Sequence, residues 1–257
     1  PAGENNFRVI SAAGENWDEF VKTTTERGLW GLENLSYIPG EVGAAAVQNI
    51  GAYGKQIEEC VEYVLAFDTE EMSLKKIFKK DCGFDYRTSI FKTPAGKRYI
   101  VTAVSFILSK TGEPVLSYKD LQKFFEGKTK NSLKTRDLRN AVVAIRQSKL
   151  PDVKELASAG SFFKNPVVDG KTLNRLLAKF PDIPHTPENK THHKISAAYL
   201  LEHIGGWKGY RDGDAGVYAK HALVLVNYGK AKSSEIYSLA MNMRDDIKKK
   251  TGILLDP

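Results

Sequence analysis

Three stretches of the first half of the chain are rich in β-branched and aromatic apolar residues, with few polar residues between them: residues 7–13, 60–68 and 98–108. Short apolar runs of this composition each predict a β-strand. A fourth strand is predicted over residues 216–227, which read "GVYAKHALVLVN".

Helical periods appear between these strands. Residues 16–28 carry Asn16 in the N-cap position, apolar side chains on one face, and Gly28 at the end. Further helices are predicted over residues 119–125 and 135–146, where apolar side chains also share one face.

The second half of the chain predicts three more helices, over residues 169–180, 194–206 and 232–252. The last of these begins with serines, has lysines in its last turn and ends at Gly252, as the helix dipole and capping preferences require. Residues 181–193 are rich in proline and are predicted to form a loop.

Together these elements indicate an α+β fold without internal repeats. A chain of 257 residues is long enough for two ordinary domains, each with its own core. Pro151 interrupts the pattern and is the candidate boundary. We therefore expect one domain over residues 1–150 and a second over residues 151–257.

Residues 29–54 show neither a helical nor a strand periodicity and are rich in glycine and alanine. Bare glycine backbone lets N–H groups approach a ligand, such as a diphosphate or the edge of a flavin. The same composition is equally typical of a tight helix-to-strand contact that admits only small side chains, and spacing alone leaves both interpretations open. The glycines concerned are Gly40, Gly43, Gly51 and Gly54.

Composition narrows the class of protein. Hydrophobic residues make up 42% of the chain and charged residues 27%, which is typical of soluble globular proteins. No apolar run approaches the length of a membrane span and the first residues lack the features of a signal peptide, so we expect a cytoplasmic protein without membrane insertion. Cys60 and Cys82 are too few for a disulfide framework and are expected to be reduced.

The formal net charge of +7 is compatible with an anionic ligand such as a nucleotide diphosphate. The basic clusters contain few aromatic residues for base stacking, so no nucleic-acid partner is expected. The five histidines lack metal-ligand spacing, and no metal is expected. The chain also lacks the sequence signatures of P-loop kinases, dinucleotide-binding Rossmann units, α/β-hydrolases and zincins.

Two cations outside the glycine-rich segment are candidates for anion binding. Arg87 lies in "FDYRTSIFK", and its guanidinium is suited to a two-pronged contact with a carboxylate. Lys149 lies at the entry to the second predicted domain. For both residues a solvated surface position is the more common explanation.

Ser161 lies in "SAGSFFKNPVV". A serine hydroxyl is a very weak acid and donates a proton only to a strongly basic centre such as a carbanion or enolate, which requires a dry pocket and nearby cations. The two phenylalanines that follow it are candidates for the dry wall, Arg87 or Lys149 for the cation, and Asn165 for a hydrogen bond to substrate. On the residues alone, a serine at a strand entry that bonds only to backbone is the more common explanation.

Three motifs occur in order: "IPGEVGAAAVQNIGAYG", "FDYRTSIFK" and "KLPD…AGSFFKNPVV". They resemble signature segments of the UDP-N-acetylenolpyruvoylglucosamine reductase family, the flavoenzymes of bacterial cell-wall precursor synthesis. "KISAAYLLEHIGGWKG", "HALVLVN" and "TGILLDP" look like the C-terminal domain of that family, so the resemblance covers essentially the whole chain. The segment "VLSYKDL" resembles the longer subclass, in which a tyrosine-bearing loop covers the site.

The resemblance implies an FAD-binding domain of the PCMH and vanillyl-alcohol-oxidase type, followed by an α+β substrate domain. It also implies an FAD-dependent reduction in two halves. NADPH first passes a hydride to the flavin and leaves. The enolpyruvyl ether of UDP-N-acetylglucosamine then occupies the same place and is reduced to UDP-N-acetylmuramate, with a serine as proton donor.

Carried over by motif, Ser161 is the proton donor and Arg87 stabilises the developing charge on the substrate carboxylate. The resemblance implies further substrate-binding residues, with the role of the last left open because relatives can carry glutamine there: Tyr86, Tyr118, Lys149, Asn165 and His221. The residues implied to line the FAD are Pro39, Gly40, Val42, Gly43, Ala44, Asn49, Gly51, Ala52 and Gly54.

The family also has an N-terminal glycine-rich stretch before the region that matches "FRVISAAGENW", and a catalytic glutamate after its closing "L-[DE]-P". From the resemblance we expect both segments in the parent enzyme, and we expect residues 1–257 alone to bind FAD weakly and turn over inefficiently. The protein is expected to be a monomer. Two alternatives stay open: another flavin enzyme of the same fold, such as a carbohydrate oxidase, and a non-catalytic module that binds a nucleotide sugar or nucleic acid.

Overall fold

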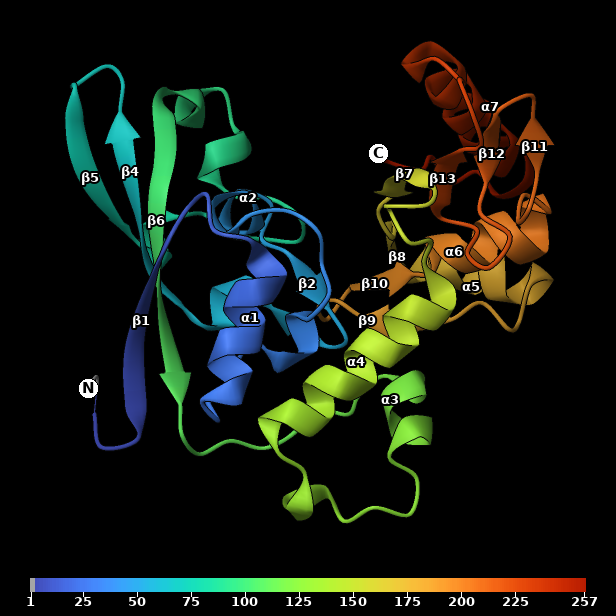
Figure 1. Ribbon diagram of the computed structural model, residues 1–257. Coiled ribbons are helices and arrows are strands. Elements are labelled where there is room, and N and C mark those ends of the chain that lie inside the picture. The colour runs from blue at the N-terminus through green and yellow to red at the C-terminus, as the bar shows by residue number, and fades with distance from the viewer. Residues whose placement is uncertain (1–2) are drawn as a thin grey trace. The chain divides into compact units, whose positions relative to one another are not determined.

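The computed structural model describes residues 3–257, which form two compact units, one ending at Arg146 and one beginning at Gln147 (Figure 1). Each unit has its own hydrophobic core, and each is described separately.

A four-stranded antiparallel sheet forms the centre of the N-terminal unit, with the strand order β1-β6-β4-β5. Its strands are β1 (Asn6–Ala12), β4 (Val61–Asp68), β5 (Ser73–Phe78) and β6 (Tyr99–Ser109). The three strands predicted in this half are confirmed. One face of the sheet packs on the core and the other is exposed, so side-chain exposure alternates along β1 and the first half of β6.

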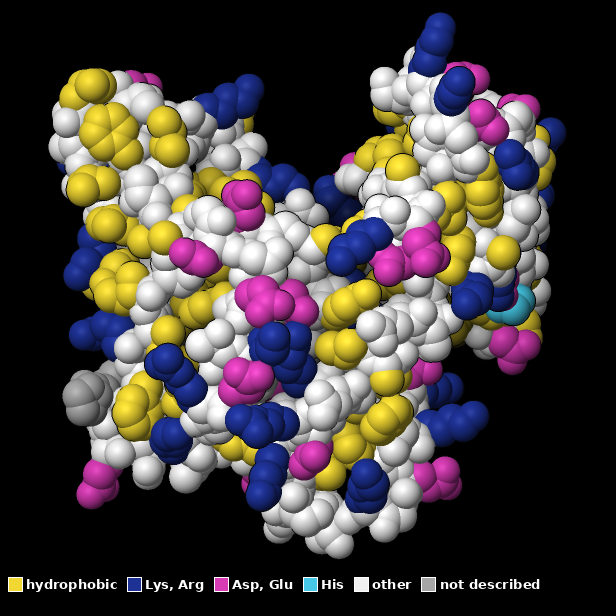
Figure 2. Space-filling model, in the orientation of Figure 1, with side chains coloured by type: hydrophobic (Ala, Val, Ile, Leu, Met, Phe, Trp, Pro, Cys, Tyr) yellow, Lys and Arg dark blue, Asp and Glu magenta, His cyan; other side chains and the backbone are white. Residues whose placement is uncertain are grey.

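Strand β5 was not predicted, because most of its apolar side chains lie on the exposed face of the sheet and not on the core. Leu74 and Phe78 lie on the exposed face, 61% and 47% accessible, whereas Ile77 packs inward. Figure 2 shows hydrophobic side chains gathered over β4 and β5 at the upper left. Pairing with β4, not burial of its own apolar residues, specifies this strand.

Helix α1 (Trp17–Glu26) packs on the core face of the sheet. The Asn16 side chain accepts a hydrogen bond of 3.0 Å from the Glu19 N–H, which confirms the predicted N-cap. Trp17 is buried among the core residues, and its indole N–H donates to the Leu35 carbonyl oxygen at 2.8 Å. The helix therefore anchors the start of the glycine-rich segment.

The glycine-rich segment contains a short helix, α2 (Val42–Val47), and a small hairpin of β2 (Gly51–Ala52) and β3 (Lys55–Gln56). Neither was predicted. The remaining short helical turns of this unit are η1 (Glu33–Leu35), η2 (Ile57–Glu59), η3 (Lys79–Asp81), η4 (Ile90–Lys92), η5 (Ala95–Arg98) and η6 (Lys130–Ser132).

Helices α3 (Lys119–Phe124) and α4 (Thr135–Lys149) follow the sheet in the sequence and confirm the two predicted helices. They share a second, smaller cluster of buried apolar side chains, to which Tyr53 and Leu116 also contribute. The irregular segment before α3 is therefore packed against both the glycine-rich segment and the helices.

The C-terminal unit contains two small antiparallel sheets with the orders β11-β12-β13-β7 and β8-β10-β9. Its strands are β7 (Ala157–Ser161), β8 (Val167–Asp169), β9 (His185–Pro187), β10 (His192–Ile195), β11 (Arg211–Asp212), β12 (Ala215–Val217) and β13 (Val224–Asn227). Its helices are α5 (Gly170–Lys179), α6 (Ala197–Tyr199), the π-helical turn η7 (Leu200–Gly205) and α7 (Ser233–Thr251).

The three predicted helices of this unit are confirmed, but two other predictions were wrong. Residues 216–227 are not one strand, because a turn at residues 218–223 reverses the chain between β12 and β13. Residues 181–193 are not only loop, because β9 and β10 pair across the Glu188–Thr191 turn. Neither turn contains glycine, which is one of the strongest sequence signals for a turn.

Within residues 3–257 no helix combines the length and apolar character that crossing a membrane requires. In the same residues, no group of three or more histidine, cysteine, aspartate or glutamate side chains is placed to hold a metal ion.

Candidate functional site

Within the glycine-rich segment, Val42 and Gly43 pack closely against residues 13–15. The N–H groups of Val42 and Gly43 donate to the Glu15 and Ala13 carbonyl oxygens at 3.0 and 2.8 Å, so they are not available to a ligand. A Cβ on Gly43 would lie 2.7 Å from the Ala13 Cβ. Both residues are buried. At these two positions the segment forms the tight contact that admits only small side chains.

Another part of the segment is open. Pro39, Gly40, Ala44 and Gly54 are exposed. Gly40 has φ +116° with no atom within 4 Å of where its Cβ would lie, so a ligand can approach the main chain directly there. Gly54 has φ +82°, but a Cβ there would lie 2.2 Å from Ser117 Oγ, so this glycine packs against the segment before α3.

Arg87 lies beside the hairpin of this segment and has φ +57°. Its guanidinium donates to the main-chain oxygen of Asn49 at 3.4 Å and to that of Gly51. The Asn49 side chain is fully buried and donates to the Asp85 oxygen at 2.9 Å, which ties the two motifs together a second time. A Cβ on Gly51 would lie 2.8 Å from Arg87 Nη1, so glycine is required for this contact.

Tyr118 joins the same region of the N-terminal unit from the segment before α3. Its ring lies against that of Tyr53, with centroids 5.4 Å apart. Burial raises the pKa of the Tyr118 hydroxyl, with a further increase from Tyr86 and an opposing effect of Arg87. The Arg87 guanidinium also lies 5.1 Å from the centre of the Tyr86 ring. The structure therefore brings together three predicted residues, Tyr86, Arg87 and Tyr118.

Two residues of this region were missed by the sequence reasoning. Arg146 donates to the Tyr37 main-chain oxygen at 2.8 Å. Burial raises the pKa of Tyr53, and the positive charge of Arg146 opposes this increase. Asn34 is fully buried, and its amide donates to the main-chain oxygens of Tyr53 and Val115. Arg146 precedes Lys149 by three residues on α4, and this spacing was an available signal; for Asn34 there was none.

A flavin cofactor has a flat ring system and an anionic diphosphate. The open glycine backbone at Gly40, and the cation of Arg87 beside Gly51, supply close main-chain approach and positive charge. Ala44 and the partly exposed Ala52 add small side chains. The residues present therefore fit a cofactor of this kind.

In the C-terminal unit, Ser161 is the last residue of β7 and pairs with Val224 of β13. It is exposed, and within residues 3–257 its hydroxyl makes no hydrogen bond. The preceding Gly160 has φ +67° at a bulge in the sheet, which bends the strand end. The backbone-bonded alternative for the hydroxyl is therefore not what the structure shows.

The two phenylalanines after Ser161 pack into the C-terminal unit. Phe163 is 3% exposed and belongs to the core of this unit, and the partly buried Phe162 packs against the same core. Their expected role in keeping water from Ser161 stays a prediction.

Of the other residues predicted for the site, Asn165 and His221 accept hydrogen bonds from the main chain of this unit. The Asn165 side chain accepts from the Ala197 N–H at 3.0 Å, at the start of α6. His221 lies in the turn between β12 and β13, and its Nδ1 accepts from the Leu223 N–H at 3.2 Å. Lys149 is the last residue of α4 and is partly buried.

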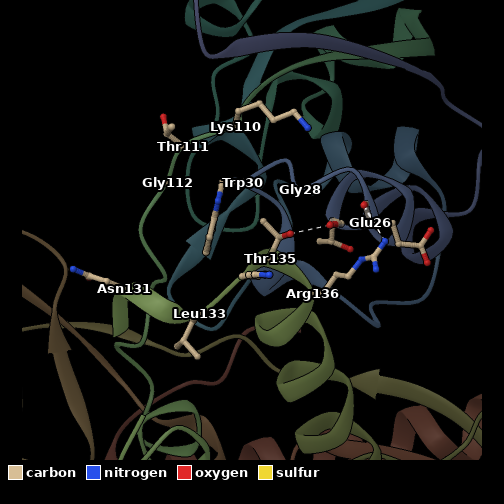
Figure 3. A pocket seen from close by; sticks show the side chains of 12 residues that line it. Glu26, Gly28, Trp30, Lys110, Thr111, Gly112, Asn131, Leu133, Thr135 and Arg136 are labelled. Atoms are coloured by element: carbon tan, nitrogen blue, oxygen red, sulfur yellow. Dashed lines mark hydrogen bonds between the residues drawn. The ribbon is translucent and has the colours of Figure 1, made fainter. Parts of the chain in front are cut away.

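A cavity of about 570 Å³ in the N-terminal unit contains none of the predicted site residues (Figure 3). Its polar groups connect α4 to the end of α1. Thr135 donates to the Thr25 oxygen at 2.8 Å, Arg136 to the Glu26 oxygen at 3.0 Å, and Lys110 to the Arg27 oxygen. We interpret it as a structural junction.

Comparisons with known proteins agree with this picture. The profile described as UDP-N-acetylenolpyruvoylglucosamine reductase, C-terminal domain, matches residues 151–257. A profile described as FAD binding domain matches residues 3–71.

The UDP-N-acetylenolpyruvoylglucosamine reductase of Chromobacterium violaceum is 44% identical over 250 residues, which are 97% of this chain and 73% of the relative. The reductase of Pseudomonas aeruginosa is 41% identical over 249 residues, with the same coverage of 97% and 73%. A crystal structure of the reductase (MurB) from Thermus caldophilus superposes with a TM-score of 0.64 at 25% identity, covering 96% of this chain and 70% of that one.

These similarities extend over both units and confirm the expected α+β fold, in which an FAD-binding domain precedes the C-terminal domain of this family. Because relatives above 40% identity match almost the whole chain, the chain belongs to the UDP-N-acetylenolpyruvoylglucosamine reductase family.

Proposed function

We propose that the protein uses NADPH and FAD to reduce the enolpyruvyl ether of UDP-N-acetylglucosamine to UDP-N-acetylmuramate, a step of peptidoglycan precursor synthesis. The observation that carries this proposal is the identity of 41–44% to reductases of this name over 97% of the chain. FAD, when bound, supplies the hydride that it has received from NADPH.

Arg87 is proposed to hold the substrate carboxylate. Two of its donor groups are already fixed on the Asn49 and Gly51 carbonyl oxygens, so the guanidinium is preorganised before substrate arrives. A fixed cation stabilises negative charge that develops on the carboxylate during reduction, without the cost of reorganising solvent.

Ser161 is proposed to deliver the proton. After hydride addition the substrate carries carbanion character next to its carboxylate, and the proton moves from Ser161 Oγ to that carbon. The exposed, unbonded hydroxyl at the end of β7 supports this role.

The remaining residues are proposed to bind and orient. Tyr86, Tyr118, Lys149 and Asn165 hold the uridine diphosphate and sugar, with His221 at the margin of the site. The flavin is lined by the open part of the glycine-rich segment and supported by its buried part, Val42, Gly43 and Asn49. Substrate and NADPH share one site, the two domains meet at Pro151, and the enzyme is a cytoplasmic monomer without a nucleic-acid partner.

The experiment is an absorbance spectrum of the full-length protein before and after NADPH, followed by a turnover assay. A flavin spectrum, and NADPH consumption only in the presence of the enolpyruvyl substrate, are expected. UDP should compete with that substrate. Oxygen consumption that UDP does not inhibit would instead favour a carbohydrate oxidase. A full-length protein without flavin absorbance would favour a non-catalytic binding module.

A further inference from the structure

The segment that carries Tyr118, residues 112–118, has no regular secondary structure in the N-terminal unit. Apart from the Tyr118 carbonyl oxygen, which accepts from the Gln122 N–H at the start of α3, its main-chain groups have no partners in a helix or a strand ladder. Contacts with other segments must therefore set its position. Leu116 supplies one contact by packing on the apolar cluster of α3 and α4.

Asn34 supplies the polar contact. Its side-chain N–H₂ donates one hydrogen bond of 3.0 Å to the Val115 oxygen and another of 2.8 Å to the Tyr53 oxygen. Val115 is 81 residues from Asn34 and Tyr53 is 19 residues from it, so one amide joins two distant segments. The reversed amide would place its oxygen against two carbonyl oxygens, so this orientation is the one that the site permits.

The joined surfaces fit closely. Gly54 has φ +82°, and a Cβ there would lie 2.2 Å from Ser117 Oγ and 3.3 Å from Val115 Cγ1. The Tyr53 and Tyr118 rings make contact next to this point. Asn34 itself is 0% exposed, so water does not compete for its donors.

We propose that Asn34 is a positioning residue, which latches the Tyr118 segment onto the glycine-rich turn and so holds the Tyr118 hydroxyl ready for the nucleotide diphosphate of the substrate. The part of this inference that concerns the nucleotide rests on the proposed function. The latch itself concerns only the N-terminal unit.

The test compares Asn34→Ala with Ser36→Ala in the full-length protein. Ser36 is a matched control because it is also fully buried in the same turn and donates to the Glu33 oxygen at 2.6 Å, but does not reach the Tyr118 segment. Hydrogen exchange over residues 112–118 and binding of UDP are measured. Losing both donor contacts should speed exchange and weaken UDP binding by about tenfold, and Ser36→Ala should change neither.

A double-mutant cycle with Tyr118→Ala separates positioning from a general loss of stability. In the Tyr118→Ala background, Asn34→Ala should weaken UDP binding by less than about twofold, since the residue that it positions is gone. Unchanged exchange in folded Asn34→Ala, or an equal loss of UDP affinity in both backgrounds, overturns the proposal.

Asn34→Ser serves as the second variant if Asn34→Ala does not fold, because one hydroxyl donor cannot bond the Tyr53 and Val115 oxygens at the same time. It should give a smaller rise in exchange and the same dependence on Tyr118; if folded Asn34→Ser gives neither, the latch is wrong. If the unmodified protein does not bind UDP but exchange responds as expected, the proposed function fails and the latch stands.

Discussion

The guanidinium of Arg87 donates a hydrogen bond to the main-chain oxygen of Gly51. The arginine assigned to the substrate is thus held by the segment assigned to the flavin, although 36 residues separate the two in sequence. A side chain at Gly51 would crowd this guanidinium, since a Cβ there would lie 2.8 Å from Arg87 Nη1. The residues that we propose for substrate and for cofactor on this unit therefore share one piece of backbone.

Replacement of Arg87 by lysine should slow reduction of the enolpyruvyl substrate by about a hundredfold, since an ammonium cannot span two carbonyl oxygens and keep a planar fork for a carboxylate. Stopped-flow measurement of the substrate half-reaction checks this. Arg8→Lys is the matched control, because Arg8 makes an exposed contact with Glu62 on the sheet. Comparable rates for Arg87→Lys and Arg8→Lys would contradict the assignment.

The two cysteines should be inert in the native protein. Burial raises the pKa of both Cys60 and Cys82 to about 12. At pH 8 this leaves on the order of a thousandfold less thiolate than an ordinary cysteine has, and labelling by a disulfide reagent should be correspondingly slow. Both thiols should react in urea, and an added cysteine, Ser238→Cys on exposed α7, should react in the native protein. Rapid native labelling of two thiols in the parent protein would disprove this.

Asp68 should make the N-terminal unit sensitive to acid. Its carboxylate is fully buried, accepts from Arg98 Nε and Nη2 at 2.8 and 2.5 Å, and has a pKa lowered to about 2, chiefly by Arg98. The pKa of an aspartate in the unfolded chain is about 4. The contribution of the ionised Asp68 to the free energy of unfolding is therefore complete above pH 4 and is lost as the pH falls toward 2.

Urea unfolding between pH 2 and pH 7 tests this. The parent protein should take up close to one proton more on unfolding between pH 2 and pH 4 than Asp68→Asn does. Asp182→Asn, at an exposed carboxyl group, should behave like the parent. Parallel pH profiles for the parent and Asp68→Asn would rule out the role of Asp68.

Local signals predicted most of the fold. The cap at Asn16 and the left-handed Gly252 after α7 are short-range features, and the helices that they mark were found. Strand β5 was not predicted because its pairing with β4 specifies it. The β12–β13 turn was not predicted because hydrogen bonds within it, such as that from the Leu223 N–H to His221 Nδ1, specify it. Sequence periodicity contains no information on such partners.

The candidate site was predicted unevenly for the same reason. Motif resemblance identified Arg87 and Tyr118, which the structure places in one region. It could not identify Asn34, whose role depends on two carbonyl groups in distant segments. Nor could it show that the phenylalanines after Ser161 are core residues.

The most direct test of the central claim is the pair of half-reactions of Ser161→Ala. Flavin reduction by NADPH should stay within about twofold of the parent, whereas reduction of the enolpyruvyl substrate should fall by about 10²–10⁴-fold, the usual contribution of a general acid. Ser234→Ala, at an exposed position of α7, is the control and should leave both rates unchanged. An equal fall in both half-reactions of Ser161→Ala, or no fall in either, would contradict the role of Ser161 as proton donor.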